Sequence, residues 1–279
     1  MSADLEISET AFWVNEVRAR NEALSGDIYA KLWASRKNEA IWREYDQQLS
    51  GDHYEFYFGI RSRYFLSLLQ SSLAAHPDLV FVNVGCGLSN YAFLAEGLSK
   101  SIEIDFPNVV QFKREKTLEW QKQGLLPPRH IVYLSANLNE ADQRQTLLEK
   151  LRVEIAGKPA FILMEGITYF LDHNCLTALF ELFAQVQTRD CRLAFDFFDP
   201  IRGADPPSAR FRSFLETRIG WSRDAYNFFE PAELVRMTQK YYKIEERSNI
   251  LEKQNEFLKK PVLSPENVAA ASYACLKRL

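Results

Sequence analysis

Three small residues, Gly85-Cys86-Gly87, form a candidate ligand-binding turn after the apolar run 79–84. Small residues at the end of a strand allow a tight turn and a close approach of the backbone to a ligand. The pyrophosphate-binding fingerprint would need a third glycine where Asn90 stands, which disfavours a dinucleotide. We call residues 85–87 the glycine turn, and the chemistry of its ligand depends on the strand that follows.

Asp105 ends the next strand-like run, twenty residues after Gly85. A carboxylate at this place can accept hydrogen bonds from both hydroxyls of a ribose. Together with the glycine turn, it predicts an adenosine ligand that carries no diphosphate. The structural alternative is that Asp105 only ends a strand and caps the helix after Pro107.

Glu165 follows the apolar run 160–164, at the edge where open α/β sheets bind ligands. A carboxylate there is partly desolvated, which costs free energy unless the group has a partner. The ammonium or sulfonium of S-adenosylmethionine would be such a partner. A salt bridge to a neighbouring Arg or Lys is the alternative.

The elements that position these side chains alternate between short apolar runs and amphipathic segments, which is typical of βαβ units. Strands are predicted at 79–84, 101–105, 130–134, 160–164 and 192–197. Helical segments are predicted at 90–97, 109–123, 140–155 and 174–187. We therefore expect an α/β fold with a doubly wound, mostly parallel sheet and helices on both faces.

Other segments complete a single predicted domain over 1–279. Helical periodicity at 10–24, 27–49 and 60–72 indicates an N-terminal helical extension over 1–76, before a cofactor-binding core at 77–198. The irregular, aromatic stretch 199–230 is predicted to be a lid-like insertion. Residues 231–279 would complete the sheet with a helix from Pro231, a strand near 243–248 and a final edge strand at 270–276.

Composition excludes several classes of function. The 279 residues are 47% hydrophobic and 25% charged, with a net charge of -3, which fits a globular protein without a field that attracts nucleic acid. We find no signal peptide or membrane-length apolar run, and expect a cytoplasmic protein. The cysteines lack metal-site spacing and are predicted to be free buried thiols; they are Cys86, Cys175, Cys191 and Cys275.

At these residues the chain resembles the leucine carboxyl methyltransferase family, which also contains polyketide and other small-molecule O-methyltransferases. Four segments carry the resemblance, in this order: Gly59-Ile-Arg-Ser-Arg63, Val82-Asn-Val-Gly-Cys-Gly87, Ile102-Glu-Ile-Asp-Phe-Pro107 with Lys113, and Glu165-Gly-Ile-Thr-Tyr-Phe-Leu171. It implies a Rossmann-like class I methyltransferase sheet of seven strands with the last antiparallel. It also implies S-adenosylmethionine as methyl donor and an oxygen as acceptor.

The resemblance also implies roles for single residues. Arg61 would hold the methionine carboxylate of the methyl donor, a task suited to a guanidinium. The glycine turn would pass against the methionine and ribose portions, and Asp105 would hold the ribose. Glu165 would lie by the amino group, with Tyr169 lining the site.

Two positions match the family less well. The family usually has Asp-Leu after the third strand, whereas this chain has Asn137-Leu138. The Asn side chain still offers an acceptor for the adenine amino group, and Asn137 is kept as an adenine contact. Lys31 would match a family lysine near the carboxylate of the methyl donor, although a solvated helix face is the simpler role.

The acceptor side is defined least by the sequence. A carboxylate acceptor is ionised at pH 7 and needs no general base, whereas a hydroxyl benefits from one. His173 is a candidate for contact with the acceptor, although Asp172-His173 also fits an ordinary helix N-terminus. Asp196 and Asp199 are comparable candidates. The aromatic side chains at 211–229 indicate an apolar acceptor, or simply bury their segment.

We therefore predict methyl transfer to a carboxylate or hydroxyl of a small molecule. Alternatives are methylation of a protein C-terminus, a nucleotide-dependent oxidoreductase, and an inactive binding module on the same fold. The presence of Arg61, Asp105 and Glu165 disfavours the inactive module. The sequence does not predict an oligomeric state.

Overall fold

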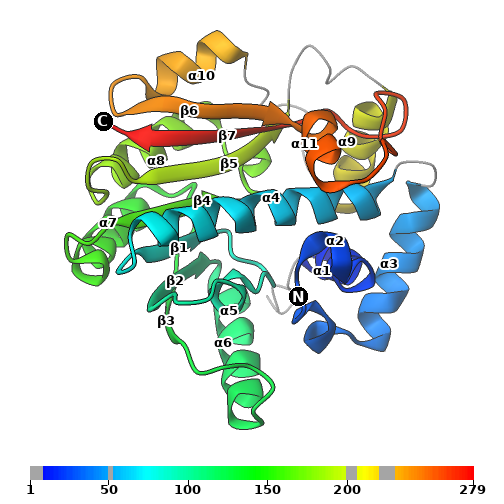
Figure 1. The fold of residues 1–279 in the computed structure, drawn as a ribbon, viewed down its shortest axis with the longest axis horizontal. Helices are drawn as coiled ribbons and strands as arrows, with labels where there is room; N and C mark the ends of the chain where they lie inside the picture. Colours follow the sequence, from blue (N-terminus) through cyan, green and yellow to red (C-terminus); the bar gives the residue numbers. More distant parts are fainter. Residues whose placement is uncertain (1–8, 50–52, 199–205, 220–229) are drawn as a thin grey trace.

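The computed structural model describes residues 9–49, 53–198, 206–219 and 230–279. A seven-stranded sheet runs through the molecule in the order β3-β2-β1-β4-β5-β7-β6 (Figure 1). The strands are β1 Val80–Val84, β2 Lys100–Asp105, β3 His130–Ser135, β4 Ala160–Met164, β5 Arg192–Phe198, β6 Tyr242–Asn249 and β7 Ala271–Arg278. All five strands predicted for the core are present, within one residue at each end.

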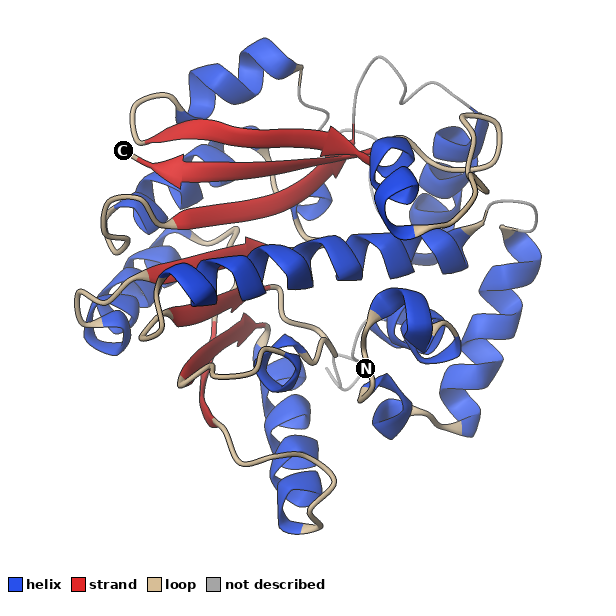
Figure 2. Cartoon of the chain, in the orientation of Figure 1, coloured by secondary structure: helices blue, strands red, loops and turns tan. Residues whose placement is uncertain are grey.

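Helices lie on both faces of the sheet, and further helices form a layer at the N-terminus (Figure 2). They are α1 Glu9–Arg20, α2 Glu22–Ser25, η1 Ala30–Trp33, α3 Arg36–Gln48, α4 Tyr54–Ala75, α5 Tyr91–Leu94, α6 Pro107–Lys122, α7 Ala141–Ile155, η2 Thr168–Phe170, α8 His173–Ala184, α9 Pro206–Ile219, α10 Pro231–Thr238 and α11 Ile250–Phe257. We call α1, α2, η1 and α3 the N-terminal layer.

The pairing confirms a mostly parallel sheet whose last strand is antiparallel. β1 pairs in parallel with β2 and β4, and β4 with β5. β7 runs antiparallel to both β5 and β6. The carboxyl ends of β1, β2, β4 and β5 therefore meet at one edge of the sheet, the edge at which such sheets bind ligands.

The sheet is buried on both faces because successive side chains of a strand point to opposite sides. On β1, Phe81 enters the core shared with α4, while Val80 and Val82 enter the core shared with α7 and α8. All five residues of β1 and of β4 are buried. This double burial explains why central strands appear in the sequence as continuous apolar runs.

The final strand was predicted at the edge of the sheet, and this is wrong. β7 lies between β5 and β6, and β6 forms the edge. The burial of the two strands gives the reason, because β7 has six consecutive buried residues, whereas in β6 exposed positions alternate mostly with half-buried ones. The helix α11 was also not predicted.

The helical predictions at the N-terminus need correction in their boundaries. Residues 10–24 divide into α1 and α2, and 27–49 divide into η1 and α3. The segment predicted at 60–72 is the middle of α4, a helix of 22 residues. No helix in the described ranges is long and apolar enough to cross a membrane.

The predicted lid is partly helical. Residues 206–219 form α9, where Phe211 and Phe214 are buried and contact the ring of Trp13 in α1. These two side chains therefore bury their segment against the N-terminal layer. Trp221, Tyr226, Phe228 and Phe229 lie outside the described residues. All four cysteines are buried and free, as predicted.

Candidate functional site

The glycine turn leaves the carboxyl end of β1 in a conformation that favours glycine. Gly85 has a φ of 67°, and its N–H donates to the carbonyl of Ile104 at 2.8 Å. A Cβ at Gly85 would lie 2.6 Å from Cδ1 of Ile167, so a larger residue would clash. The backbone conformation and the close approach of Ile167 together require glycine.

Asp105 connects the end of β2 to this turn. Its Oδ2 accepts the N–H of Gly87 at 2.8 Å, and its Oδ1 accepts the N–H of Phe106 at 2.8 Å. Burial raises the pKa of Asp105, while the hydrogen bonds from Gly87 and Phe106 lower it. The carboxylate is only partly buried, and each of its oxygens can accept a further hydrogen bond.

Beneath the turn lies a buried ion pair that sequence reasoning did not assign to the site. Lys113 Nζ donates to Glu103 Oε2 at 2.9 Å and to the carbonyl of Cys86 at 3.1 Å. Asn83 Nδ2 donates to the same carboxylate oxygen at 2.8 Å. Lys113 therefore fixes the turn from below, and its presence in the motif with Asp105 was the available signal.

The N-terminal layer holds the other side of the turn through buried polar groups. Arg18 Nη2 donates to the carbonyl of Leu88 at 3.1 Å. The amide of Asn90 donates to Asp27 at 2.9 Å and accepts from the Trp33 indole at 3.0 Å. Burial raises the pKa of Asp27, with Arg18 acting against it. Asn90, which stands where the dinucleotide fingerprint would have its third glycine, thus attaches the N-terminal layer to the sheet.

A second buried cluster lies at the ends of β4 and β5. Arg61 of α4 donates from Nε to Glu165 Oε1 at 2.9 Å and from Nη1 to Asp196 Oδ2 at 3.0 Å. All three side chains are at most 7% exposed. One guanidinium therefore serves two carboxylates, and the trio carries a surplus negative charge when both are ionised.

Tyrosines and a backbone amide complete this cluster. Tyr91 donates to Glu165 Oε2 at 2.6 Å, and Tyr169 donates to Asp196 Oδ2 at 2.6 Å. The N–H of Gly166 donates to Asp196 Oδ1 at 2.7 Å. Burial raises the pKa of Asp196, whereas Arg61 lowers it, and burial raises the pKa of Tyr169 well above its ordinary value. Tyr169 is therefore a phenol that donates rather than a base.

The adenine candidates follow β3 at the same edge as Asp105. Asn137 Oδ1 accepts the N–H of Asn139 at 3.1 Å, an arrangement that fixes the loop. Leu138 is buried, and its carbonyl accepts from Arg144 and from the thiol of Cys175. Both roles remain predictions.

The remaining candidates have partners elsewhere or lie outside the described residues. His173 Nδ1 faces Glu233 of α10 at 2.8 Å, with 44% of the side chain exposed. Lys31 contacts Glu22 at 2.6 Å and is 65% exposed, in agreement with a solvated role. Asp199 lies in a range that the structure does not describe.

Comparisons with known proteins show the family to which the chain belongs. A family model described as leucine carboxyl methyltransferase matches residues 11–184. A relative from Streptomyces coelicolor, whose name proposes an S-adenosyl-L-methionine-dependent methyltransferase, is 25% identical over 209 residues. That match spans 67% of this chain and 64% of the relative's length.

Solved structures share the fold at low sequence identity. A DUF574 family protein from Streptomyces avermitilis gives a TM-score of 0.61 at 9% identity, over 95% of this chain and 97% of that one. A protein from Thermobifida fusca, described as a proposed methyltransferase, gives 0.62 at 12% identity, over 94% of each chain.

Proposed function

The chain belongs to the leucine carboxyl methyltransferase family, and from this premise we propose that it is an S-adenosylmethionine-dependent O-methyltransferase. Its acceptor is a small molecule that offers a carboxylate or hydroxyl oxygen. The observation that carries the proposal is the buried Arg61–Glu165 ion pair, beside the glycine turn at the carboxyl edge of the sheet.

The ion pair fits the amino acid end of the methyl donor, which is a zwitterion. Its carboxylate would replace Glu165 on Arg61, and its ammonium would replace Arg61 on Glu165, so the exchange leaves the buried charge unchanged. Asp196 would keep accepting the hydrogen bond from Nη1 of Arg61 while the methyl donor binds. The guanidinium therefore stays oriented while it changes partner, which favours binding in one geometry.

The adenosine end fits the adjacent strand ends. Asp105 keeps acceptor capacity for ribose hydroxyls, and the glycine turn passes close to it through the Gly87 N–H. Asn137 and Leu138 would line the adenine. When bound, S-adenosylmethionine supplies a methyl group attached to a sulfonium, while the side chains described here bind, orient and exclude water.

A carboxylic acid suits this site better than an alcohol. Its oxygen is ionised at pH 7 and needs no proton removed. Tyr169 stays protonated and donates to Asp196, so its proposed role is to line the site and position that carboxylate. A hydroxyl acceptor would need another base, and His173 is the proposed candidate, although it pairs with Glu233.

Calorimetric titration with S-adenosylhomocysteine, with NAD as the comparison, tests the cofactor. We expect binding of the first and none of the second. Mass spectrometry with isotope-labelled methyl donor, on panels of carboxylic acids, phenols and amines, tests the acceptor. Absence of S-adenosylhomocysteine binding would overturn the proposal, and transfer to nitrogen alone would overturn the oxygen acceptor.

A further inference from the structure

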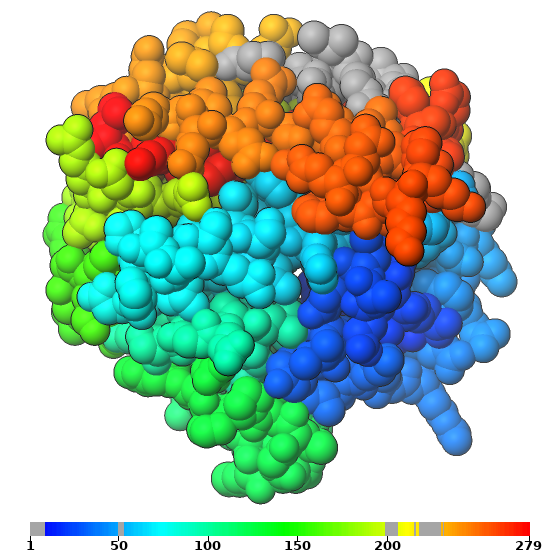
Figure 3. Space-filling view, viewed as in Figure 1, coloured from blue at the N-terminus to red at the C-terminus, as the bar shows by residue number. Residues whose placement is uncertain are grey.

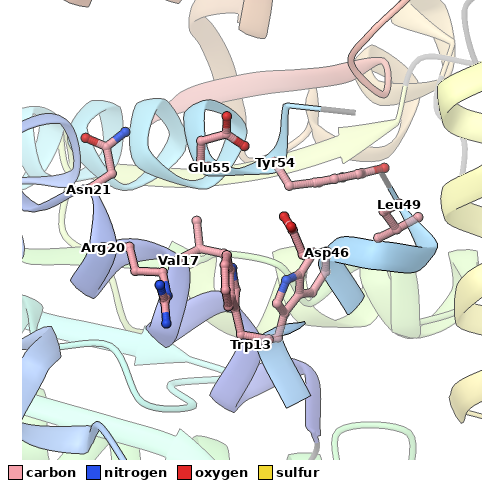
Figure 4. Close-up of a pocket in the computed structure, with 9 residues that line it drawn as sticks. Trp13, Val17, Arg20, Asn21, Asp46, Leu49, Tyr54 and Glu55 are labelled. Atoms are coloured by element: carbon pink, nitrogen blue, oxygen red, sulfur yellow. The ribbon is translucent and has the colours of Figure 1, made fainter. Parts of the chain in front are cut away.

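A cavity of about 340 Å³, partly open to solvent, lies between α1, α3 and α4 in the N-terminal part of the molecule. Figure 4 shows Trp13 and Val17 on one side of this space and Tyr54 and Glu55 on the other. The apolar walls are Trp13, Val17, Leu49 and Tyr54, and each is at most 5% exposed. A volume of a few hundred Å³ with aromatic walls is typical of a site for a small organic molecule.

The polar lining of the cavity is acidic. Asp46 and Glu55 contribute carboxylates, and Arg20 contributes one guanidinium. Arg20 is already engaged, because its Nε lies 2.9 Å from Glu16 Oε1 and its Cζ lies 3.6 Å from the ring centroid of Trp42. Glu55 Oε1 lies 3.5 Å from Nδ1 of His53, whereas Asp46 has no ion-pair partner within the described residues. With two carboxylates and one guanidinium, the lining carries a surplus of one negative charge.

This cavity is separate from the site proposed for the methyl donor. None of Arg61, Asp105 and Glu165 lines it. The ring of Trp13 contacts Phe58 at 4.9 Å, and Phe58 lies 4.8 Å from Cζ of Arg61. Phe58 does not line the cavity, but it lies between Trp13, which does, and Arg61.

We propose that the cavity binds a small organic cation, with a flat aromatic or apolar body and a protonated amine. The aromatic walls would bury the body and attract the positive charge. The two carboxylates would favour an amine over a neutral group and would repel an acid. The same chemistry could come from an acceptor that is methylated or from an effector that alters binding of the methyl donor.

Three probes that share an indole ring but differ in the charge of the side chain test the effect of charge on binding. Tryptamine carries an amine, indole-3-ethanol is neutral and indole-3-propionate is an acid. In calorimetric titrations of the full chain we expect tryptamine to bind best and the acid worst, with a difference that shrinks as salt rises. Equal affinities, a preference for the acid, or no binding at millimolar concentrations would overturn the proposal.

Variants of the lining locate the binding site. Asp46→Asn and Glu55→Gln should each weaken tryptamine about two- to fivefold, the scale of an exposed ion pair, without changing the affinity for indole-3-ethanol. Glu149→Gln removes an exposed carboxylate on α7 and is the matched control. Unchanged tryptamine binding in both lining variants would contradict the assignment.

Val17→Phe should fill the cavity and remove binding of all three probes. Thermal unfolding and S-adenosylhomocysteine titration show whether this variant is folded. If it does not fold, the two carboxylate variants decide the question. Binding of the probes to a folded Val17→Phe protein would place them elsewhere and overturn the proposal.

An experiment with labelled methyl donor distinguishes a ligand that is a methyl acceptor from a ligand that is an effector. Tryptamine offers only nitrogen atoms to a methyl group, so label on tryptamine would place the acceptor in the cavity and would at the same time overturn the proposed oxygen acceptor. A shift in donor affinity without label would identify an effector site. Because probe binding is measured without methyl transfer, failure of the cavity proposal and failure of the proposed function give different results.

Discussion

At the scale of single residues, Asp105 combines a structural and a proposed ligand-binding task. It fixes the glycine turn through Gly87 and would accept the ribose hydroxyls with its remaining capacity. A test must therefore measure stability and affinity in the same variant.

Asp105→Ala should weaken binding of S-adenosylhomocysteine by about 1–3 kcal/mol, because the ligand loses a partly buried charged acceptor. Calorimetric titration measures the loss, and thermal unfolding measures any damage to the turn. Asp78→Ala, an exposed carboxylate before β1, is the control. Unchanged affinity in a folded Asp105→Ala protein would leave only the structural task.

Arg61→Met should lower the free energy of unfolding by about 3–5 kcal/mol, because Glu165 and Asp196 would lose their counter-charge. The loss should be larger at pH 8 than at pH 5. Burial raises the pKa of Asp196 even beside Arg61, and without the guanidinium it rises further. When the pKa of a carboxyl group is higher in the folded than in the unfolded protein, the free energy of unfolding falls as the pH rises from the unfolded pKa to the folded pKa.

Urea unfolding at the two pH values measures this effect. Arg152→Met, which removes an exposed arginine from α7, should leave the pH dependence of stability as it is in the original protein. A loss in Arg61→Met that is equal at both pH values, or larger at pH 5, would count against the buried cluster.

At the scale of elements, the turn after β1 depends on contacts from three parts of the chain. Lys113 of α6 holds it from below, Asp105 of β2 holds its amide, and Ile167 packs on Gly85. A change of side chain at Gly85 therefore affects both backbone conformation and packing.

Gly85→Ala should destabilise the protein and weaken S-adenosylhomocysteine binding. The left-handed φ costs about 1–2 kcal/mol for a residue with a Cβ, and the clash with Ile167 adds to it. Gly157→Ala isolates the first cost, because Gly157 has a φ of 74° and no atom within 4 Å of a Cβ. Urea unfolding of both variants gives the comparison. Equal losses in the free energy of unfolding of the two variants would show that the Ile167 side chain moves aside with no free-energy cost.

The last two strands show how burial decides position in a sheet. The alternating pattern of β6 suits an edge that faces water on one side, whereas β7 is buried along most of its length. Strand order depends on which strand can be covered on both sides, and local periodicity does not contain that information.

At the scale of the whole molecule, the N-terminal layer is attached to the sheet at the turn proposed to hold the methyl donor. Figure 3 shows the N-terminal part of the chain, in blue, beside α4, in cyan, and the green residues that follow it. Arg18, Asp27 and Trp33 make the polar contacts to Leu88 and Asn90. The layer therefore contributes to the shape of the site.

Asn90→Gly tests this attachment, and it also restores the third glycine of the dinucleotide fingerprint. We expect a lower unfolding temperature, because the Trp33 indole loses its acceptor and Asp27 loses a donor, at about 1–3 kcal/mol for each unsatisfied group. We expect no NAD binding. Asn139→Gly, at an exposed position, is the control. An unchanged unfolding temperature would show that the layer is held by apolar contacts alone.

The core of the sheet could be predicted from the amino-acid sequence alone. Five strands were predicted within one residue because short β-branched or apolar runs alternate with helical segments along the chain, a signal that is local. The glycine turn and Asp105 were also predicted together, since each stands at the end of such a run. The structure brings them within hydrogen-bond distance, while their roles toward a ligand stay predictions.

Pairs between groups far apart in the sequence could be identified only in the folded protein. Arg61 meets Asp196 135 positions later, and Asn90 meets Asp27 63 positions earlier. No periodic pattern encodes these contacts, because they depend on how α4 and the N-terminal layer pack on the finished sheet. The same is true of the acidic cavity, whose walls come from three helices that the sequence placed only approximately.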